Sequence, residues 1–207
     1  MKNQKNEDST IVAGEIRYPD IITFRTCSGV TYPNFETIDS DIVIYNAASC
    51  PYLKTIRGNA KIYASANIPN LETIEGFACI HRGAYLPNLT TITEGAYIDP
   101  EANIPKLKTV DGPVYIAERA CVPKLESVNG NVYIYPKAIA PKLKTIGGDA
   151  TINEGANVPK LKTVGGNAHI HKGASAPKLK SVGGFAVIYS GAYVPKLRFT
   201  KKEKTND

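Results

Sequence analysis

Apolar residues recur along the chain at fixed points of an 18-residue unit. Ten prolines fall 18 residues apart between Pro33 and Pro195, which defines nine complete units over residues 33–194. Counted from its proline, each unit is apolar at positions 3, 6, 10, 12, 16 and 18, and six positions in nine units make 54 sites that are all apolar. Such strict repetition predicts that equivalent residues stack in the same buried environment.

The spacing within a unit is typical of β-strands. Positions 10 and 12, and again 16 and 18, are apolar pairs at i, i+2, and β-branched residues concentrate at positions 6, 12 and 18. Proline at position 1 and glycine at positions 7, 8 or 15 leave runs too short for a helix. Each unit is therefore predicted to form one coil of a β-solenoid, with short strands near positions 2–6, 9–13 and 15–18 that pair in parallel with neighbouring coils.

The predicted fold class is all-β, a single β-solenoid of nine coils in which a right-handed winding is favoured. Nine coils at a strand spacing of ~4.8 Å make a rod of roughly 43 Å. Residues 1–32 hold two non-repeating apolar runs, 11–18 and 21–27, which we expect to form an N-terminal cap on the solenoid of residues 33–194. Residues 195–207 begin a tenth unit and end in a charged tail.

Composition fits a narrow core and a soluble chain. The sequence has no Trp and one Met, as expected when stacked Leu, Ile and Ala fill the interior. It has neither a run of 18 apolar residues nor an apolar leader, so we expect no membrane span, no secretory signal and a cytoplasmic location. The four cysteines have irregular spacings that fit no zinc motif and indicate reduced thiols.

The motif L-x-x-[IV]-x-G-x-[AV]-x-I occurs at residues 143–152 and 161–170. It resembles the short leucine-rich repeats of receptor-L-domain type that are found in bacterial and phage proteins, and the resemblance covers residues 33–194. It implies a solenoid used as a binding scaffold and assigns no catalytic role. The hexapeptide left-handed β-helix also has 18 residues per coil, but it requires a small inward residue at position 4, where this chain has Lys, Glu or Thr. That difference favours the right-handed coil.

Positive charge gathers in the C-terminal half. Residues 1–104 carry 8 basic and 12 acidic groups, a net −4, whereas residues 105–207 carry 17 and 7, a net +10. Positions 2 and 4 of the last six units form a Lys ladder of eleven cations, broken by Glu126: Lys106, Lys108, Lys124, Lys142, Lys144, Lys160, Lys162, Lys178, Lys180, Lys196 and Arg198. Stacked like charges repel unless they meet an anion, so the ladder is a candidate site for nucleic acid or an anionic glycan. The alternative is that Lys keeps an exposed sheet soluble and was copied with the repeat.

Aromatic residues gather at positions 11 and 13, which lie on one side of a predicted strand. This Tyr/His face comprises Tyr45, Tyr63, His81, Tyr97, Tyr115, Tyr133, Tyr135, His169, His171 and Tyr189. Tyr supplies rigid contact area with a polar tip and is enriched at protein interfaces, which makes the face a candidate site for a protein partner. Tyr also has a high β-propensity and stacks across strands without any ligand, so a structural role is the alternative.

The sequence offers little for catalysis or metal binding. His169 and His171 share a side of one strand, but the neighbouring coils supply no third strong ligand. Cys79, His81 and Asp99 would stack into a Cys-His-Asp group, but on an open sheet without a loop to form a pocket. We therefore expect no catalytic residue, metal or cofactor.

The leading functional prediction is a non-enzymatic interaction module whose Tyr/His face contacts a protein partner. A phage or mobile-element factor acting on a host protein would fit, by analogy with the family alone. The alternative is a polyanion binder that uses the Lys ladder. The sequence leaves the partner's identity and the oligomeric state open.

Overall fold

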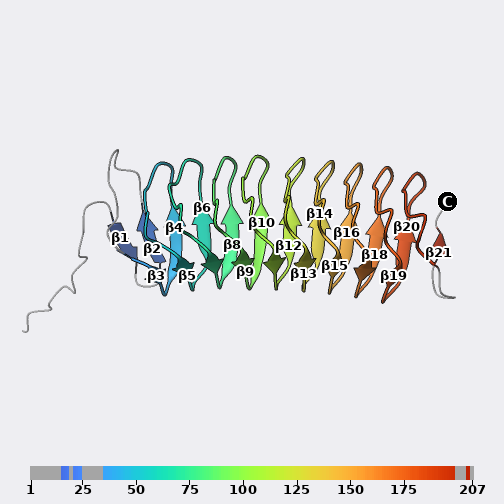
Figure 1. Cartoon of the computed structure of the whole chain (residues 1–207), viewed down its shortest axis with the longest axis horizontal. Coiled ribbons are helices and arrows are strands. Elements are labelled where there is room, and N and C mark those ends of the chain that lie inside the picture. Colours follow the sequence, from blue (N-terminus) through green and yellow to red (C-terminus); the bar gives the residue numbers. More distant parts are fainter. Residues whose placement is uncertain (1–14, 19–20, 25–34, 199–203, 206–207) are drawn as a thin grey trace, which may run out of the picture.

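The computed structural model describes residues 15–18, 21–24, 35–198 and 204–205, and within them it confirms an all-β solenoid. The 18-residue units stack along one axis, and each contributes a strand to two long sheets (Figure 1). Of the predicted N-terminal cap, only strands 15–18 and 21–24 belong to the described residues. Cys27 and most of the charged tail lie outside them.

A nine-stranded parallel sheet is built from positions 5 and 6 of every unit. Its strands are β3 (Thr37–Ile38), β5 (Thr55–Ile56), β7 (Thr73–Ile74), β9 (Thr91–Ile92), β11 (Thr109–Val110), β13 (Ser127–Val128), β15 (Thr145–Ile146), β17 (Thr163–Val164) and β19 (Ser181–Val182). In each strand position 5 points outward, and position 6 points into the rod.

A twelve-stranded sheet forms the opposite side and is built mainly from positions 10–12. Its repeat strands are β4 (Asp41–Ile44), β6 (Ala60–Ile62), β8 (Phe77–Ile80), β10 (Gly95–Ile98), β12 (Val114–Ile116), β14 (Val132–Ile134), β16 (Ala150–Ile152), β18 (Ala168–Ile170) and β20 (Ala186–Ile188). At one end β2 (Ile21–Phe24) pairs in parallel with β4 and antiparallel with β1 (Glu15–Tyr18). At the other end β21 (Lys204–Thr205) pairs in parallel with β20.

The register is the sequence repeat itself. Tyr115 of β12 pairs with Tyr133 of β14, and Ile134 pairs with Ile152 of β16, so that each residue pairs with the one 18 positions away. Every position of the repeat therefore forms a column that runs the length of the rod. A side chain meets its own equivalents above and below it.

The strands are shorter than predicted. The expected strand at positions 15–18 is reduced to single parallel bridges at position 17, such as Ser49 with Asn67. The expected strand at positions 2–6 keeps only positions 5 and 6. Proline at position 1 has no N–H to donate, and a turn closes around it when the amide of Leu53 donates to the carbonyl of Cys50 over 3.3 Å. The backbone bends at these points and cannot continue a strand.

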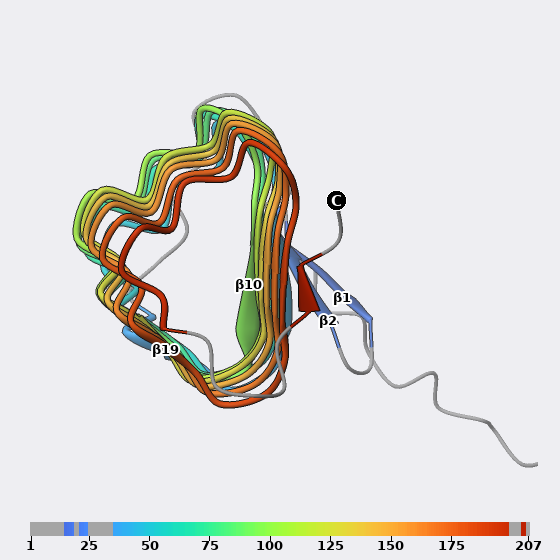
Figure 2. The same ribbon diagram turned by 90° about the vertical axis from the view of Figure 1, so that its right-hand side faces the viewer.

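The coil is right-handed, as the sequence favours. The even-numbered strands run upward in Figure 1, and Figure 2 views the same rod from its C-terminal end. From there the chain rises along the twelve-stranded sheet, crosses the top and descends on the opposite side (Figure 2). It moves towards the viewer while it turns counter-clockwise, which is the right-handed sense.

The core is the set of inward columns that the repeat predicts. Of the 54 apolar sites, 49 are buried, which leaves five that are not: Phe35, Val182, Ile188, Ala192 and Val194. All five lie in the first or the last complete unit. Phe35 was expected inside but is 39% exposed. In the inner units the stacked Leu, Ile, Val and Ala side chains are covered on both sides along the axis, as close packing requires.

Asparagine and aspartate at position 9 link neighbouring coils through their side chains. The side-chain oxygen in one coil accepts a hydrogen bond from the position 9 amide of the next. The donors and acceptors are Asn59 to Asp41 (2.7 Å), Phe77 to Asn59 (2.7 Å), Asp149 to Asn131 (2.8 Å), Asn167 to Asp149 (2.6 Å) and Phe185 to Asn167 (3.1 Å). These bonds satisfy backbone donors where the chain enters the twelve-stranded sheet.

Two columns favour glycine for different reasons. Position 15 has a positive φ in all nine units, and five of these residues are not glycine, which shows that a side chain fits there. At position 8 the backbones of neighbouring coils approach closely. A Cβ on Gly130 would lie 2.4 Å from the carbonyl carbon of Gly112, a distance that no side chain can accept.

We expect Gly130→Ala and Gly173→Ala to differ strongly in stability. Gly173 has φ +71°, and a Cβ there would come no closer than 3.7 Å to the amide nitrogen of Gly155, so its cost is the left-handed backbone alone, about 1 kcal/mol. The backbone clash at Gly130 should cost ~3 kcal/mol or more. Urea unfolding of the two variants measures both values, and equal losses would contradict the close approach of the coils.

Candidate binding surfaces

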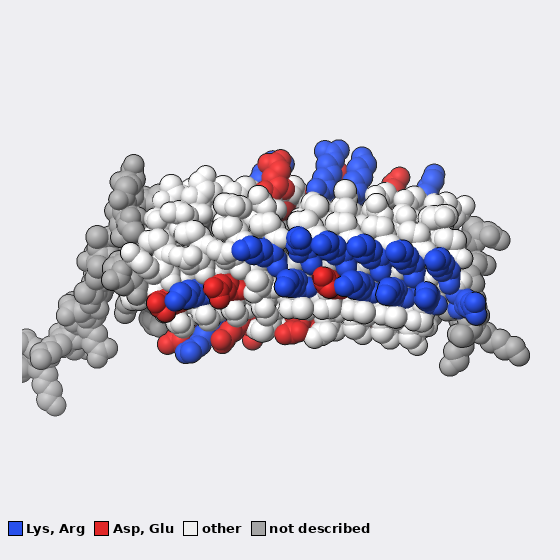
Figure 3. All heavy atoms as spheres, in the orientation of Figure 1, with Lys and Arg blue, Asp and Glu red and all other residues white. Residues whose placement is uncertain are grey.

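The Lys ladder lies on the outside of the rod because its two positions flank a buried leucine. Leu143 is fully buried between Lys142 and Lys144, and the same arrangement recurs in each unit. Figure 3 shows the basic side chains as two parallel rows along the C-terminal half of one face. Position 2 supplies an unbroken row of six lysines, Lys106, Lys124, Lys142, Lys160, Lys178 and Lys196. The structure thus brings together the ladder residues that the sequence predicts.

Glu126 gives the ladder its one internal counter-charge. The ammonium of Lys144 donates to Oε2 of Glu126 over 2.6 Å. This hydrogen bond and the Lys144 charge, with smaller effects of Lys142 and Lys108, hold the pKa of Glu126 below its ordinary value. No other ladder cation forms an ion pair with a described residue. Within the part of the chain that the structure describes, ten of the eleven charges therefore have no acidic partner.

The row at position 2 shows the repulsion that stacked like charges produce. The pKa of Lys142 lies below its ordinary value. The main cause is the neighbouring ammonium of Lys124, and partial burial and the charge of Lys160 add to it. Lys142 is a middle member of the row, with a lysine one coil away on each side. The neighbouring ammonium groups therefore disfavour the charged form of Lys142.

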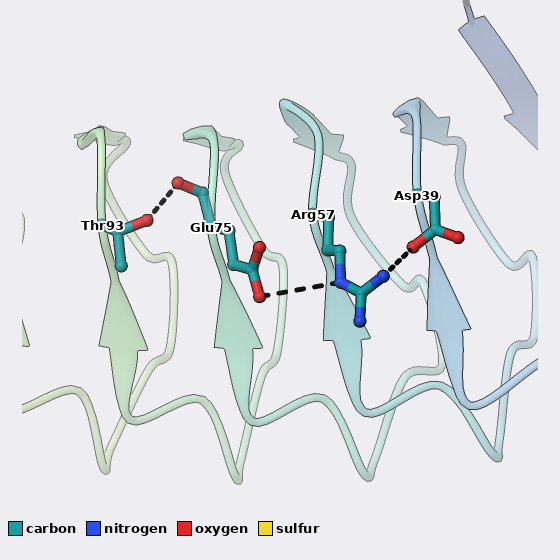
Figure 4. Close-up of polar contacts among 4 residues, drawn as sticks. All are labelled: Asp39, Arg57, Glu75 and Thr93. Atoms are coloured by element: carbon teal, nitrogen blue, oxygen red, sulfur yellow. Dashed lines mark hydrogen bonds and ion pairs between the residues drawn. The ribbon is translucent and has the colours of Figure 1, made fainter.

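Other charged columns avoid this repulsion by alternating in sign. At position 7 the guanidinium of Arg57 contacts Oδ1 of Asp39 at 2.7 Å and Oε1 of Glu75 at 3.9 Å (Figure 4). The hydroxyl of Thr93 then donates to the backbone carbonyl of Glu75. At position 4 of the first two units, Lys54 pairs with Glu36 at 3.1 Å. Stacked neighbours in the N-terminal half thus compensate one another.

At position 2 of the third and fourth units, asparagine forms a hydrogen bond to the preceding coil. The side-chain amide of Asn70 donates to the carbonyl of Pro51 over 2.6 Å, and that of Asn88 donates to the carbonyl of Pro69 over 2.7 Å. The same position can therefore hold a neutral residue that bonds to the coil beneath it. From Lys106 onward the chain has lysine there instead.

The Tyr/His face lies on the outside of the twelve-stranded sheet, where its ring contacts form four separate groups rather than one row. Tyr45, Tyr63 and His81 stack with ring centroids 5.0 and 4.3 Å apart. A second cluster joins Tyr97, Tyr115 and Tyr133, with the last two stacked at 4.9 Å. The other two groups are pairs: His171 with Tyr189 at 4.6 Å, and His169 with Phe185, edge to face, at 5.6 Å.

Stacking limits what the Tyr/His face presents to a partner. Tyr115 and Tyr133 lie nearly parallel, 3° apart, so each covers a face of the other. Flat rings of a base or sugar have correspondingly less ring surface to stack on. Edges and hydroxyl groups remain accessible, and Tyr135 and Tyr189 are the most exposed members, at 40% and 38%.

The Cys79, His81 and Asp99 group shows no activated thiol. Nδ1 of His81 lies 3.1 Å from Oδ2 of Asp99, which links two adjacent coils. Burial raises the pKa of the Cys79 thiol, and the nearby Asp99 raises it further although Lys61 opposes the shift. A nucleophilic cysteine has a lowered pKa, so this environment acts in the opposite direction. Among the described residues, no three His, Cys, Asp or Glu side chains are placed to hold a metal ion.

A hydroxyl column borders the Lys ladder at position 5 and is not among the binding residues expected from the sequence. In the units that carry the ladder it consists of Thr109, Ser127, Thr145, Thr163 and Ser181, all half-buried or exposed. Its signal in the sequence is Thr or Ser at position 5 of all nine units.

Comparisons with protein-family models, with curated proteins and with solved structures found no match to this chain. Within the described residues, no helix has the length and apolar character needed to cross a membrane.

Removing one charge from the middle of the ladder should stabilise the fold. We expect Lys142→Gln to raise the melting temperature by about 1–2 °C at low salt, because it relieves repulsion from Lys124 and Lys160. Added salt should shrink the gain, since it screens the same repulsion. Lys54→Gln, which removes the pair with Glu36, is the control and should give no rise. Thermal unfolding at two salt concentrations checks this, and a Lys142→Gln variant no more stable than the parent would contradict it.

Proposed function

We propose that the protein is a non-enzymatic binding module whose Lys ladder holds a linear polyanion along the rod. One observation carries the proposal: the ladder stacks like charges over six coils with a single internal counter-charge. The charged columns of the N-terminal half compensate themselves through pairs such as Arg57 with Asp39. The same scaffold therefore permits columns that are neutral or that alternate in the sign of their charge. The Lys ladder does neither.

The energetics favour an anionic ligand. Repulsion within the ladder destabilises the free protein, and a bound polyanion converts that repulsion into attraction. The cations sit on paired coils, so little backbone order is lost when the ligand binds. Release of counterions from the ligand adds an entropic driving force that weakens with salt.

Assignment to the short leucine-rich repeats of receptor-L-domain type is part of the proposal. The buried leucine at position 3 and the buried Ile or Val at position 6 support it, because these are the residues that the motif specifies. A cytoplasmic location is likewise proposed. Its support is that Cys50, Cys79 and Cys121 are free thiols, as is usual in a reducing compartment.

A protein partner at the Tyr/His face is the second candidate. The exposed rings of Tyr135 and Tyr189 favour it, since amphipathic aromatic groups anchor protein interfaces. Such a partner would be a host protein if the chain comes from a phage or mobile element, which is an analogy with the family alone. Truncation of both rings to alanine would abolish this contact and spare polyanion binding.

The test of the main proposal is the salt dependence of heparin binding. Heparin affinity should fall steeply with salt, and replacing Lys142, Lys144, Lys160 and Lys162 by Gln should weaken it and flatten the slope by about three. The variant with Tyr135→Ala and Tyr189→Ala is the control and should bind as the parent does. Titrations at three salt concentrations give the slopes. Absence of binding, or a slope that the four Gln substitutions leave unchanged, would overturn the proposal.

A further inference from the structure

The shape of the Lys ladder restricts which polyanions fit it. Its two rows come from residues two apart in the chain, so the Cα atoms of the two rows are separated by at most about 7 Å. Six coils span ~24 Å along the axis. Figure 3 shows the rows running straight along the rod. The track therefore has the width of one extended chain.

A nucleic-acid duplex does not match this track. Its two backbones wind around each other with a turn of ~34 Å, so a straight and narrow row would meet each backbone only where it crosses. Reading a duplex also requires an element that enters a groove. In the five complete ladder units the adjoining columns are Pro at position 1 and Thr or Ser at position 5, which are too short to enter one.

Single-stranded nucleic acid fits the width but finds no stacking partner. Proteins that bind it place aromatic rings beside the cationic groove, one for each of several bases. In the five complete ladder units, neither adjoining column contains an aromatic ring. The aromatic clusters lie instead on the twelve-stranded sheet. Bases held on the ladder would have no aromatic partner among the residues of these columns.

The hydroxyl column suits a sugar polymer. Thr145 and Thr163 are exposed at position 5, beside Lys144 and Lys162. A hydroxyl both donates and accepts hydrogen bonds, and a sugar ring offers the same groups. Each coil therefore presents ammonium groups and a hydroxyl side by side, and the set repeats every ~4.8 Å.

The N-terminal end of the ladder adds a hollow between lysine side chains. A depression of about 200 Å³ is lined by Thr90, Pro105, Lys106, Lys108 and Lys124. The ammonium of Lys106 is held there by Oδ1 of Asn88 at 2.6 Å. The surface of the hollow is mainly apolar and comes from lysine stems and the ring of Pro105, while the hydroxyl of Thr90 donates to the carbonyl of Glu72 over 3.2 Å. Such a surface suits the apolar face of a sugar ring, with the lysine charges at its rim.

We infer that the ligand of the Lys ladder is an anionic glycan, a linear polysaccharide with sulfate or carboxylate groups. It lies parallel to the rod axis, with its anionic groups on the ammonium rows and its hydroxyls against the position 5 column. This inference rests on the proposed polyanion binding and names the ligand class.

A competition panel at one salt concentration tests it. The probes are heparin, polygalacturonate, a thymidine oligonucleotide, a DNA duplex and polyphosphate, matched in total charge. One of the two glycans should bind at least tenfold more tightly than either nucleic acid. Tighter binding of a nucleic acid or of polyphosphate would overturn the inference and leave the proposed function standing. Failure of every probe would overturn both.

A pair of hydroxyl variants tests the contact itself. Thr145→Val with Thr163→Val keeps shape and β-propensity but removes two hydroxyls, so glycan affinity should fall about fivefold while polyphosphate affinity stays constant. Thr37→Val makes the same change in the first unit, outside the ladder, and should have no effect. Unchanged glycan affinity in the double variant would contradict the role of the hydroxyl column.

Discussion

In-register parallel pairing between coils 18 residues apart is the constraint on which the rest of the structure depends. It stacks every side chain on its own equivalents, as with Tyr115 and Tyr133. Where the repeated residue is apolar, the column becomes core. Where it is Asn or Asp at position 9, the column becomes a hydrogen-bonded ladder. Where backbones come close, as at Gly130, only glycine fits.

The same constraint also governs charged side chains, because a column either pairs opposite charges or accumulates like charges. Neighbours one coil apart either alternate in sign, as Asp39, Arg57 and Glu75 do, or repel. Charges alternate in the N-terminal half, whereas like charges repel in the Lys ladder. Since stacking is cooperative along the rod, the stable core can tolerate a strained surface row. Outward positions, which do not pack into the core, can thus form a binding surface without changing the fold.

Inward positions were predictable from the sequence because burial acts on every copy of the repeat at once. Leu143 and Ile152 are buried as the period requires, whereas Phe35 is exposed because it belongs to the first unit. Strand lengths were overestimated, since the period does not show how sharply the chain turns around each proline. Ring contacts such as Tyr63 with His81 depend on side-chain angles that no spacing determines. The hydroxyl column was visible as Thr or Ser but acquires meaning only beside the ladder.

Removal of one whole coil tests the central claim most directly. Deleting residues 141–158 should close the rod in register, because Asn131 then stacks on Asn167, and it removes Lys142 and Lys144 from the ladder. Deleting residues 69–86 removes a coil without a ladder residue. We predict that both proteins fold, and that the salt slope of heparin binding falls by about two charges in the first deletion alone. Equal slopes in the two deletions, or a shortened rod that fails to fold, would contradict the account.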